Sequence, residues 1–78
     1  MFEISTLIYD PQTIKQQYPE GTVIELIKLH DKLATLKPGS RGIVLCVDDI
    51  GQIHIKWNSG SHLALIPGID SFCILKKE

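Results

Sequence analysis

Residues 51–68 read GQIHIKWNSGSHLALIPG, and this stretch decides the fold class. Polar and apolar side chains alternate strictly from Gln52 to Trp57, which is the period of a β-strand with one buried face. Residues 58–60 (NSG) suit a three-residue turn, because Gly60 tolerates the left-handed conformation that such a turn requires. Residues 61–66 then form the return strand, which Pro67-Gly68 ends. The stretch therefore predicts an antiparallel hairpin.

Further short strands flank this hairpin on both sides. The run GIVLCV, residues 42–47, is continuously apolar and has strand length. Asp48-Asp49-Ile50-Gly51 separates this run from the hairpin and has the composition of a turn. Residues 72–75 (FCIL) are the last strand. Short strands with turns every eight to twelve residues predict a mainly β domain that forms a small barrel.

Residues 22–37 are ambiguous between helix and strand. Leu26, Leu29, Leu33 and Leu36 recur at helical spacing, and residues 22–25 (TVIE) fit a capping box. The first half, TVIELI, is instead rich in β-branched residues, which favours a strand. The pattern alone favours a helix, and the alternative of a strand stays open.

The N-terminal part predicts a short helix. Asp10 suits the N-cap and Pro11 the first helical position, so we expect a helix from Pro11 to about Gln17 that Pro19 ends. Residues 1–9 (MFEISTLIY) are expected to form an arm or a short strand. Tyr9 and Tyr18 could add a stacking surface.

Size and composition limit the range of functions. The chain has 78 residues, 8 Lys and Arg against 9 Asp and Glu, and a formal net charge of −1. One core is the most that such a chain sustains, and the absence of a basic excess makes nucleic acid a less favoured partner. No stretch predicts a signal peptide or membrane span, so we expect a cytoplasmic protein. Cys46 and Cys73 lie in apolar stretches and are interpreted as small core residues.

The hairpin and its flanks resemble a known family. The string VDD-G-IHI-W-N-G-S-LALIPG in residues 47–68, with Gly21-Thr22 and Pro38-Gly39 upstream, is similar to the domain-of-unknown-function family 4314 over about residues 20–75. The resemblance implies a strand over about 22–29 with a loop to Ser40, and an SH3-like barrel of about five short antiparallel strands. It also implies a bacterial phage or mobile-element origin and no catalytic residues. Residues 1–19 would be an arm or short helix, and 20–78 the barrel.

The strand assignment predicts which side chains fill the core. Because these side chains occupy the interior of the barrel, no room remains there for a ligand. Any function should then lie on the outer surface, on the loops or between subunits. The predicted core is Ile24, Leu26, Ile43, Leu45, Val47, Ile53, Ile55, Trp57, Leu63, Leu65, Phe72 and Ile74.

Five residues are candidates for ligand binding. In the predicted hairpin register His54, Lys56 and His62 share the outer face, where they could hold a phosphate or carboxylate. Arg41 could anchor an anion from a loop, and Trp57 could stack on a base or a proline. A solvated outer face, a surface charge and a core tryptophan are the simpler explanations of the same pattern.

Metal and acid–base sites are less favoured. His54, His62 and Asp49 could supply three zinc ligands, but Lys56 beside them would repel a cation. Turn chemistry explains Asp48 and Asp49 better than a catalytic pair does. We expect no metal, no cofactor and no catalysis.

These observations favour a non-enzymatic binding module encoded by a phage or mobile element. We expect it to bind a host protein in the bacterial cytoplasm, in a counter-defence role. One alternative is a homo-oligomer that sequesters a signalling nucleotide between subunits. Another is binding to single-stranded nucleic acid.

Overall fold

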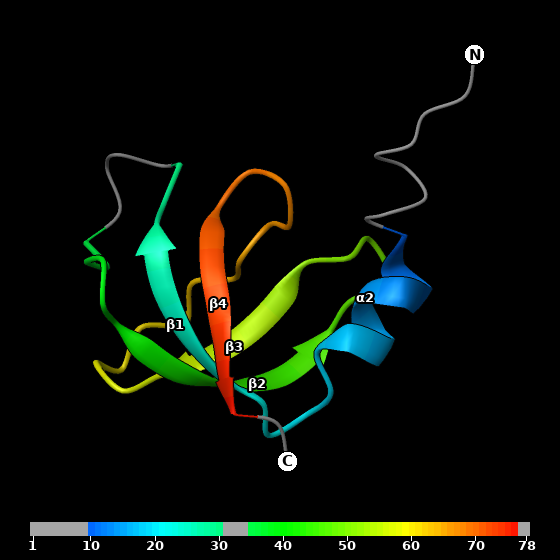
Figure 1. Cartoon of the computed structure of the whole chain (residues 1–78), viewed down its shortest axis with the longest axis horizontal. Helices are drawn as coiled ribbons and strands as arrows, with labels where there is room; N and C mark the ends of the chain where they lie inside the picture. Colours follow the sequence, from blue (N-terminus) through cyan, green and yellow to red (C-terminus); the bar gives the residue numbers. More distant parts are fainter. Residues whose placement is uncertain (1–9, 31–34, 77–78) are drawn as a thin grey trace.

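The fold is mainly β, as predicted, with four strands in one antiparallel sheet. The structure is a computed structural model that describes residues 10–30 and 35–76 (Figure 1). The sheet has the strand order β3-β2-β1-β4. The arm expected over residues 1–9, with Tyr9, lies outside the described residues. The elements in chain order are α2 (Pro11–Gln17), β1 (Val23–Lys28), β2 (Arg41–Val47), β3 (Ile53–Trp57) and β4 (Ser71–Lys76).

The ambiguous segment forms a strand in its first half. Residues Val23–Lys28 make β1, which pairs with both β2 and β4 and so lies inside the sheet. Ile24 and Leu26 are 0% and 1% exposed on its inner face. The pattern-based expectation of a helix is therefore wrong here. Pairing on both edges and the β-branched side chains outweigh the helical leucine spacing.

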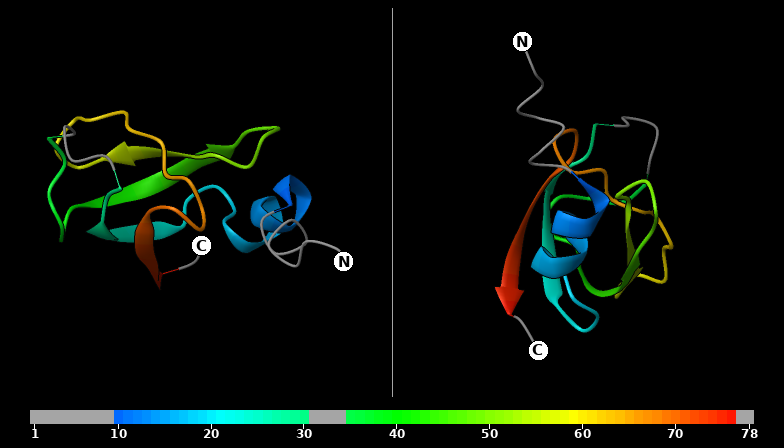
Figure 2. Two further views of the ribbon diagram at one scale, coloured as in Figure 1. Left: turned by 90° about the horizontal axis from the view of Figure 1, so that it is seen from above. Right: turned by 90° about the vertical axis from the view of Figure 1, so that its right-hand side faces the viewer.

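The short helix forms where the sequence predicted it. The Asp10 carboxylate accepts hydrogen bonds from the backbone N–H groups of Gln12 (3.1 Å) and Thr13 (3.3 Å), which caps the helix. Ile14 is buried on the side of the core. Figure 2 shows α2 beside the curved sheet rather than across its outer surface. The aromatic ring of Tyr18, just after the helix, lies 5.6 Å from that of Phe72 and links α2 to β4.

Strand β2 differs from the prediction in which side chains face the core. Ile43 and Leu45 were expected inside, but each is 44% exposed, whereas Gly42 and Val44 are buried. Because the run is apolar throughout, the sequence pattern does not show its phase, that is, which of its side chains face the core. Gly42 sets it instead, because a Cβ there would lie only 2.9 Å from the Trp57 Cα. Only glycine therefore fits beneath β3 at this position.

A β-bulge then changes the phase of β2. The register with β3 shifts between Val44 and Cys46, so Leu45 and Cys46 are both exposed and Val47 is buried again. The expectation that Cys46 is a core residue is therefore wrong. Cys73 in β4 is only partly buried.

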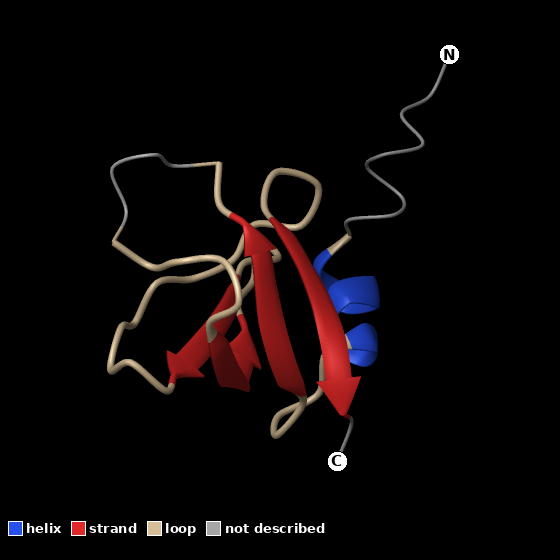
Figure 3. Ribbon diagram, turned by 60° about the vertical axis from the view of Figure 1, so that its left-hand side comes forward, coloured by secondary structure: helices blue, strands red, loops and turns tan. Residues whose placement is uncertain are grey.

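The predicted return strand is reduced to a single β-bridge. Ile53 and Leu65 exchange two backbone hydrogen bonds of 2.9 Å, in the predicted register. Between the turn and this bridge the Leu63 carbonyl accepts a hydrogen bond from the Trp57 indole N–H (2.8 Å). In a regular ladder that carbonyl would accept a hydrogen bond from the backbone of β3. Here it accepts the indole N–H instead, and residues 61–64 do not form a regular strand. Among the described residues the sheet therefore has four strands and not five, and it stays open (Figure 3).

The core contains most of the predicted residues. Ile24, Leu26, Val47, Ile53, Ile55, Trp57 and Leu65 are buried as predicted, and Leu63, Phe72 and Ile74 are partly buried against them. Three residues outside the predicted core are also buried: Ile14, Leu36 and Val44. In residues 10–30 and 35–76, no helix has the length and apolar character needed to span a bilayer.

Candidate binding surface on the outer sheet face

One row of side chains crosses all four strands on the outer face of the sheet. Lys56 of β3 pairs with Ile43 of β2, Ile43 pairs with Val23 of β1, and Val23 pairs with Lys76 of β4. We call these four residues the central row. Both lysines are exposed, Ile43 is 44% exposed and Val23 is partly exposed. The row is thus an apolar centre between two ammonium groups.

More apolar surface adjoins the central row. Leu45 and Cys46, in the bulge of β2, are both exposed. Leu75 of β4 is 44% exposed and lies where the β1–β4 register shifts opposite Val23. Leucine and isoleucine at this exposure are unremarkable singly, but several on one sheet face mark a contact surface.

The next row along the strands is electrically neutral. Arg41 of β2 lies opposite Glu25 of β1, and its Nε donates a hydrogen bond to the Glu25 Oε1 at 3.0 Å. The side chains of the two residues are 59% and 30% exposed. Arg41, a predicted anion anchor, is therefore already paired with a carboxylate.

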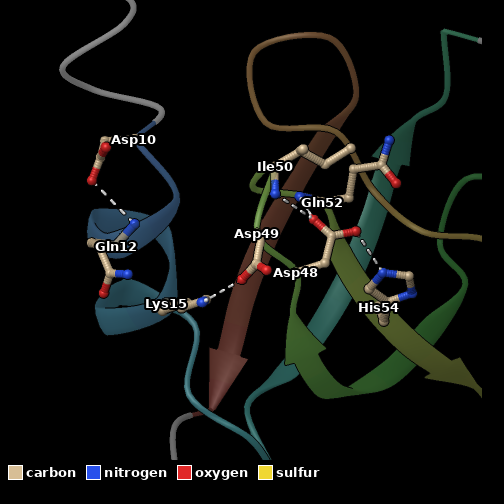
Figure 4. Close-up of polar contacts among 8 residues, drawn as sticks. All are labelled: Asp10, Gln12, Lys15, Asp48, Asp49, Ile50, Gln52 and His54. Carbon is tan, nitrogen blue, oxygen red and sulfur yellow. Dashed lines mark hydrogen bonds and ion pairs between the residues drawn. The ribbon is translucent and has the colours of Figure 1, made fainter.

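His54 and the turn after β2 form a hydrogen-bonded unit (Figure 4). The Asp48 Oδ1 accepts the backbone N–H groups of Ile50 (3.1 Å) and Gln52 (2.9 Å), and its Oδ2 lies 2.8 Å from the His54 Nε2. The hydrogen bond with His54 has the largest effect on the Asp48 carboxyl and lowers its pKa below the usual 3.8. Burial opposes this effect, and the two backbone hydrogen bonds add to the lowering. The turn chemistry predicted for Asp48 is therefore confirmed.

The second carboxylate of the turn has a separate contact. The Asp49 Oδ1 lies 3.3 Å from the Lys15 Nζ of α2, and the Asp49 side chain is fully exposed. This ion pair connects the turn to the helix across the surface (Figure 4). The two adjacent aspartates thus have different partners and do not face each other as an acid–base pair.

The predicted ligand-binding residues are only partly brought together. Arg41, His54 and Lys56 share the outer face. Trp57 lies on the inner face, 2% exposed, with its indole N–H bonded to Leu63. His62 is exposed in the loop after β3, outside the strands of the sheet. No three His, Cys, Asp or Glu side chains within residues 10–30 and 35–76 converge on a point that suits a metal ion.

Two grooves lie away from the outer face. One of about 360 Å³ lies between the end of α2 and the start of β4, where Tyr18, Ile27, Ile69 and Phe72 supply apolar walls. The other, about 560 Å³, lies between the loop before β2 and the turn after β3, and its lining includes Lys37, Ser40, Ser59 and Ser61. Neither groove contains the predicted binding residues.

The central row was missed because its strand phases were assigned incorrectly. Placing Ile43 in the core removed the centre of the row. The apolar run in residues 42–47 could have indicated this surface. A strand of this sheet buries only one face, so a run that is apolar on both faces leaves apolar side chains exposed.

The chain belongs to the family described as a domain of unknown function, DUF4314, which confirms the resemblance. The family model matches residues 10–75. The match begins about ten residues earlier than expected, so it includes α2. No curated protein and no solved structure matches the chain.

Proposed function

We propose that this member of the DUF4314 family is a non-enzymatic module that binds a protein partner on the outer face of its sheet. One observation carries the proposal: Ile43 is 44% exposed at the centre of the central row, with Leu45 and Leu75 equally exposed beside it. Exposed apolar side chains on one face favour protein association, because burial removes their surface from water.

The proposed architecture of the module is an SH3-like barrel. The bridge between Ile53 and Leu65 continues the sheet beyond β3. The tight turn over residues 66–70, held by the Asp70 carboxylate bonded to the Ile66 N–H at 3.0 Å, then leads into β4. A fifth strand at the bridge would extend the order β4-β1-β2-β3 toward closure of a small barrel.

We propose a host protein as the partner, with the chain encoded by a phage or mobile element and acting in the bacterial cytoplasm against a defence system. The small size, the net charge of −1 and the setting implied by the family resemblance support this role.

Two other functions have less support. A single-strand binder would need an accessible aromatic platform, and Trp57 is buried with its indole N–H engaged. An oligomer that sequesters a nucleotide would need several cations gathered at one phosphate site, whereas Arg41 is paired with Glu25, and Lys56 and Lys76 lie on the two opposite edge strands of the sheet. The protein partner is therefore the better proposal.

Affinity capture from a bacterial lysate, with matched isoleucine variants as bait, tests the proposal. Ile43→Ser should lose a stoichiometric partner that the wild type retains. Ile69→Ser is the control, since Ile69 is 53% exposed but lies in the turn before β4. A partner that binds both variants equally, or no stoichiometric partner for the wild type, would contradict the proposal.

A further inference from the structure

We propose that the partner presents an extended segment in which two carboxylates flank an apolar side chain, with the pattern acidic–x–apolar–x–acidic. This inference rests on the proposed function and specifies the chemistry that the outer face recognises. It follows from the charges and the spacing of the central row.

The outer face has two lysines that pair with no carboxylate in the part of the chain that the structure describes. Among residues 10–30 and 35–76, no carboxylate lies within ion-pair distance of Lys56 or Lys76. Two carboxylates at and beside the outer face already have partners, since Glu25 is bonded to Arg41 and Asp48 to His54. The chain as a whole has a net charge of −1, so this face is positive on a slightly negative molecule. A complementary surface must therefore be acidic at two points.

The register gives the distance between those points. Measured along the curved sheet, Lys56 and Lys76 are three strand spacings apart, which is about 14 Å at roughly 4.8 Å per spacing. In an extended peptide the side chains at i and i+4 point the same way and lie about 13 Å apart. The side chain at i+2 then falls between them, over Ile43 and Val23. A peptide laid across the strands thus matches the central row with one acidic residue at each end and an apolar residue between.

A second copy of the chain does not fit this face. In a two-fold face-to-face dimer that stacks the two central rows, Lys56 meets either Lys56 or Lys76 of the other copy. Both orientations set ammonium against ammonium at each end, which costs free energy at a desolvated contact. Charge complementarity therefore favours a different, acidic partner over self-association.

A nucleic acid strand fits less well than an acidic peptide. The centre of the row is aliphatic, with Ile43 and Val23 where a strand binder would present aromatic rings. A phosphate backbone would satisfy the two lysines but would leave this apolar centre uncovered. The combination of charge and apolar surface thus favours a protein segment.

Selection from a display library of random 12-residue peptides tests the inference. The library is panned on the wild-type chain, and the recovered peptides are then titrated against the wild type, Ile43→Ser and the double variant K56E/K76E. We expect the pattern acidic–x–apolar–x–acidic to be enriched, and the double variant to bind these peptides at least about tenfold more weakly, since two rim ion pairs are lost and reversed. Affinity for the wild type should also fall between 50 and 500 mM salt.

The outcomes separate the inference from the proposed function. Peptides that depend on Ile43 but lack the acidic spacing, or that bind K56E/K76E as tightly as the wild type, overturn the inference alone. Peptides that bind Ile43→Ser unchanged, or no recovered peptides, overturn both. Urea unfolding of each variant checks the fold, and K56Q/K76Q replaces the double variant if charge reversal prevents folding.

Discussion

Two neighbouring rows of the same sheet have opposite chemistry. The central row on the outer face runs Lys56, Ile43, Val23, Lys76, and the adjacent inner row runs Trp57, Gly42, Ile24, Ile74. The two rows are one residue apart on β3, β2 and β1, and two residues apart on β4, where the register shifts at Leu75. Trp57, Gly42 and Ile24 are buried, whereas three of the four outer residues are exposed. The same backbone pairing therefore supports one row that stabilises the fold and another that is available to a partner.

The largest difference between the rows should appear when one isoleucine in each is truncated. Ile24→Ala should destabilise the chain by about 3 kcal/mol, because it leaves a cavity in the core. Ile43→Ala should cost less than about 1 kcal/mol, since that side chain is already 44% exposed. Urea unfolding measures both. Similar losses for the two variants would mean that the outer row also stabilises the fold.

The inner row should also resist enlargement at its glycine. Gly42→Ala should cost about 2 kcal/mol, because its Cβ would lie 2.6 Å from the Ile55 Cγ2 and 2.7 Å from the Lys56 carbonyl oxygen. Cys46→Ala in the same strand is the control, since Cys46 is exposed and should tolerate the change. An unchanged urea midpoint for Gly42→Ala would show that β3 moves away without cost.

A smaller and pH-dependent loss is expected at the turn beside the outer row. Asp48→Asn removes the charged acceptor whose pKa lies below 3.8. A carboxyl with a lowered pKa stabilises the folded state above its unfolded pKa and loses that contribution as the pH falls through the folded pKa. The stability difference between wild type and Asp48→Asn should therefore be complete at pH 7 and shrink below about pH 3.8.

Urea unfolding at pH 7 and at pH 3 measures this difference. Asp49→Asn is the matched control, because the exposed contact of Asp49 with Lys15 should contribute little at either pH. A stability difference for Asp48→Asn that stays constant with pH would show that hydrogen-bond geometry, and not charge, stabilises the turn.

The smallest effect is expected at the neutral ion pair of the outer face. Glu25→Gln should change the free energy of unfolding by less than about 1 kcal/mol, because both side chains of the Arg41–Glu25 pair are partly exposed. The same variant leaves Arg41 unneutralised and should tighten binding to acidic peptides on the outer face. Titration with those peptides, compared with the wild type, detects this change.

Local signals predicted the elements whose chemistry lies within a few residues. The cap at Asp10, the turn at Asp48 and the strand Ile53–Trp57 were all correct. Each depends on a single side-chain bond or on strict alternation, which a short stretch of sequence displays completely.

Features that depend on distant contacts were not predictable in the same way. The phase of β2 depends on the contact of Gly42 with β3, and the course of residues 61–64 departs from a strand where the Trp57 indole bonds to Leu63. The family resemblance supplied the strand at β1, which the leucine spacing alone would have missed. The central row could not be predicted either, because it depends on Ile43 of β2 facing outward.

The bulge in β2 gives this strand one position at which its length can change. Removing either Leu45 or Cys46 would leave a single residue of β2 opposite His54, so β2 and β3 would pair in a regular ladder. The side chains before and after the deletion would keep their present sides of the sheet. A single deletion elsewhere in β2 would turn every following side chain to the other face. Within β2, one-residue insertions and deletions among relatives should therefore concentrate at Leu45–Cys46. The exposed side chains beside the central row can vary there while the same side chains stay in the core.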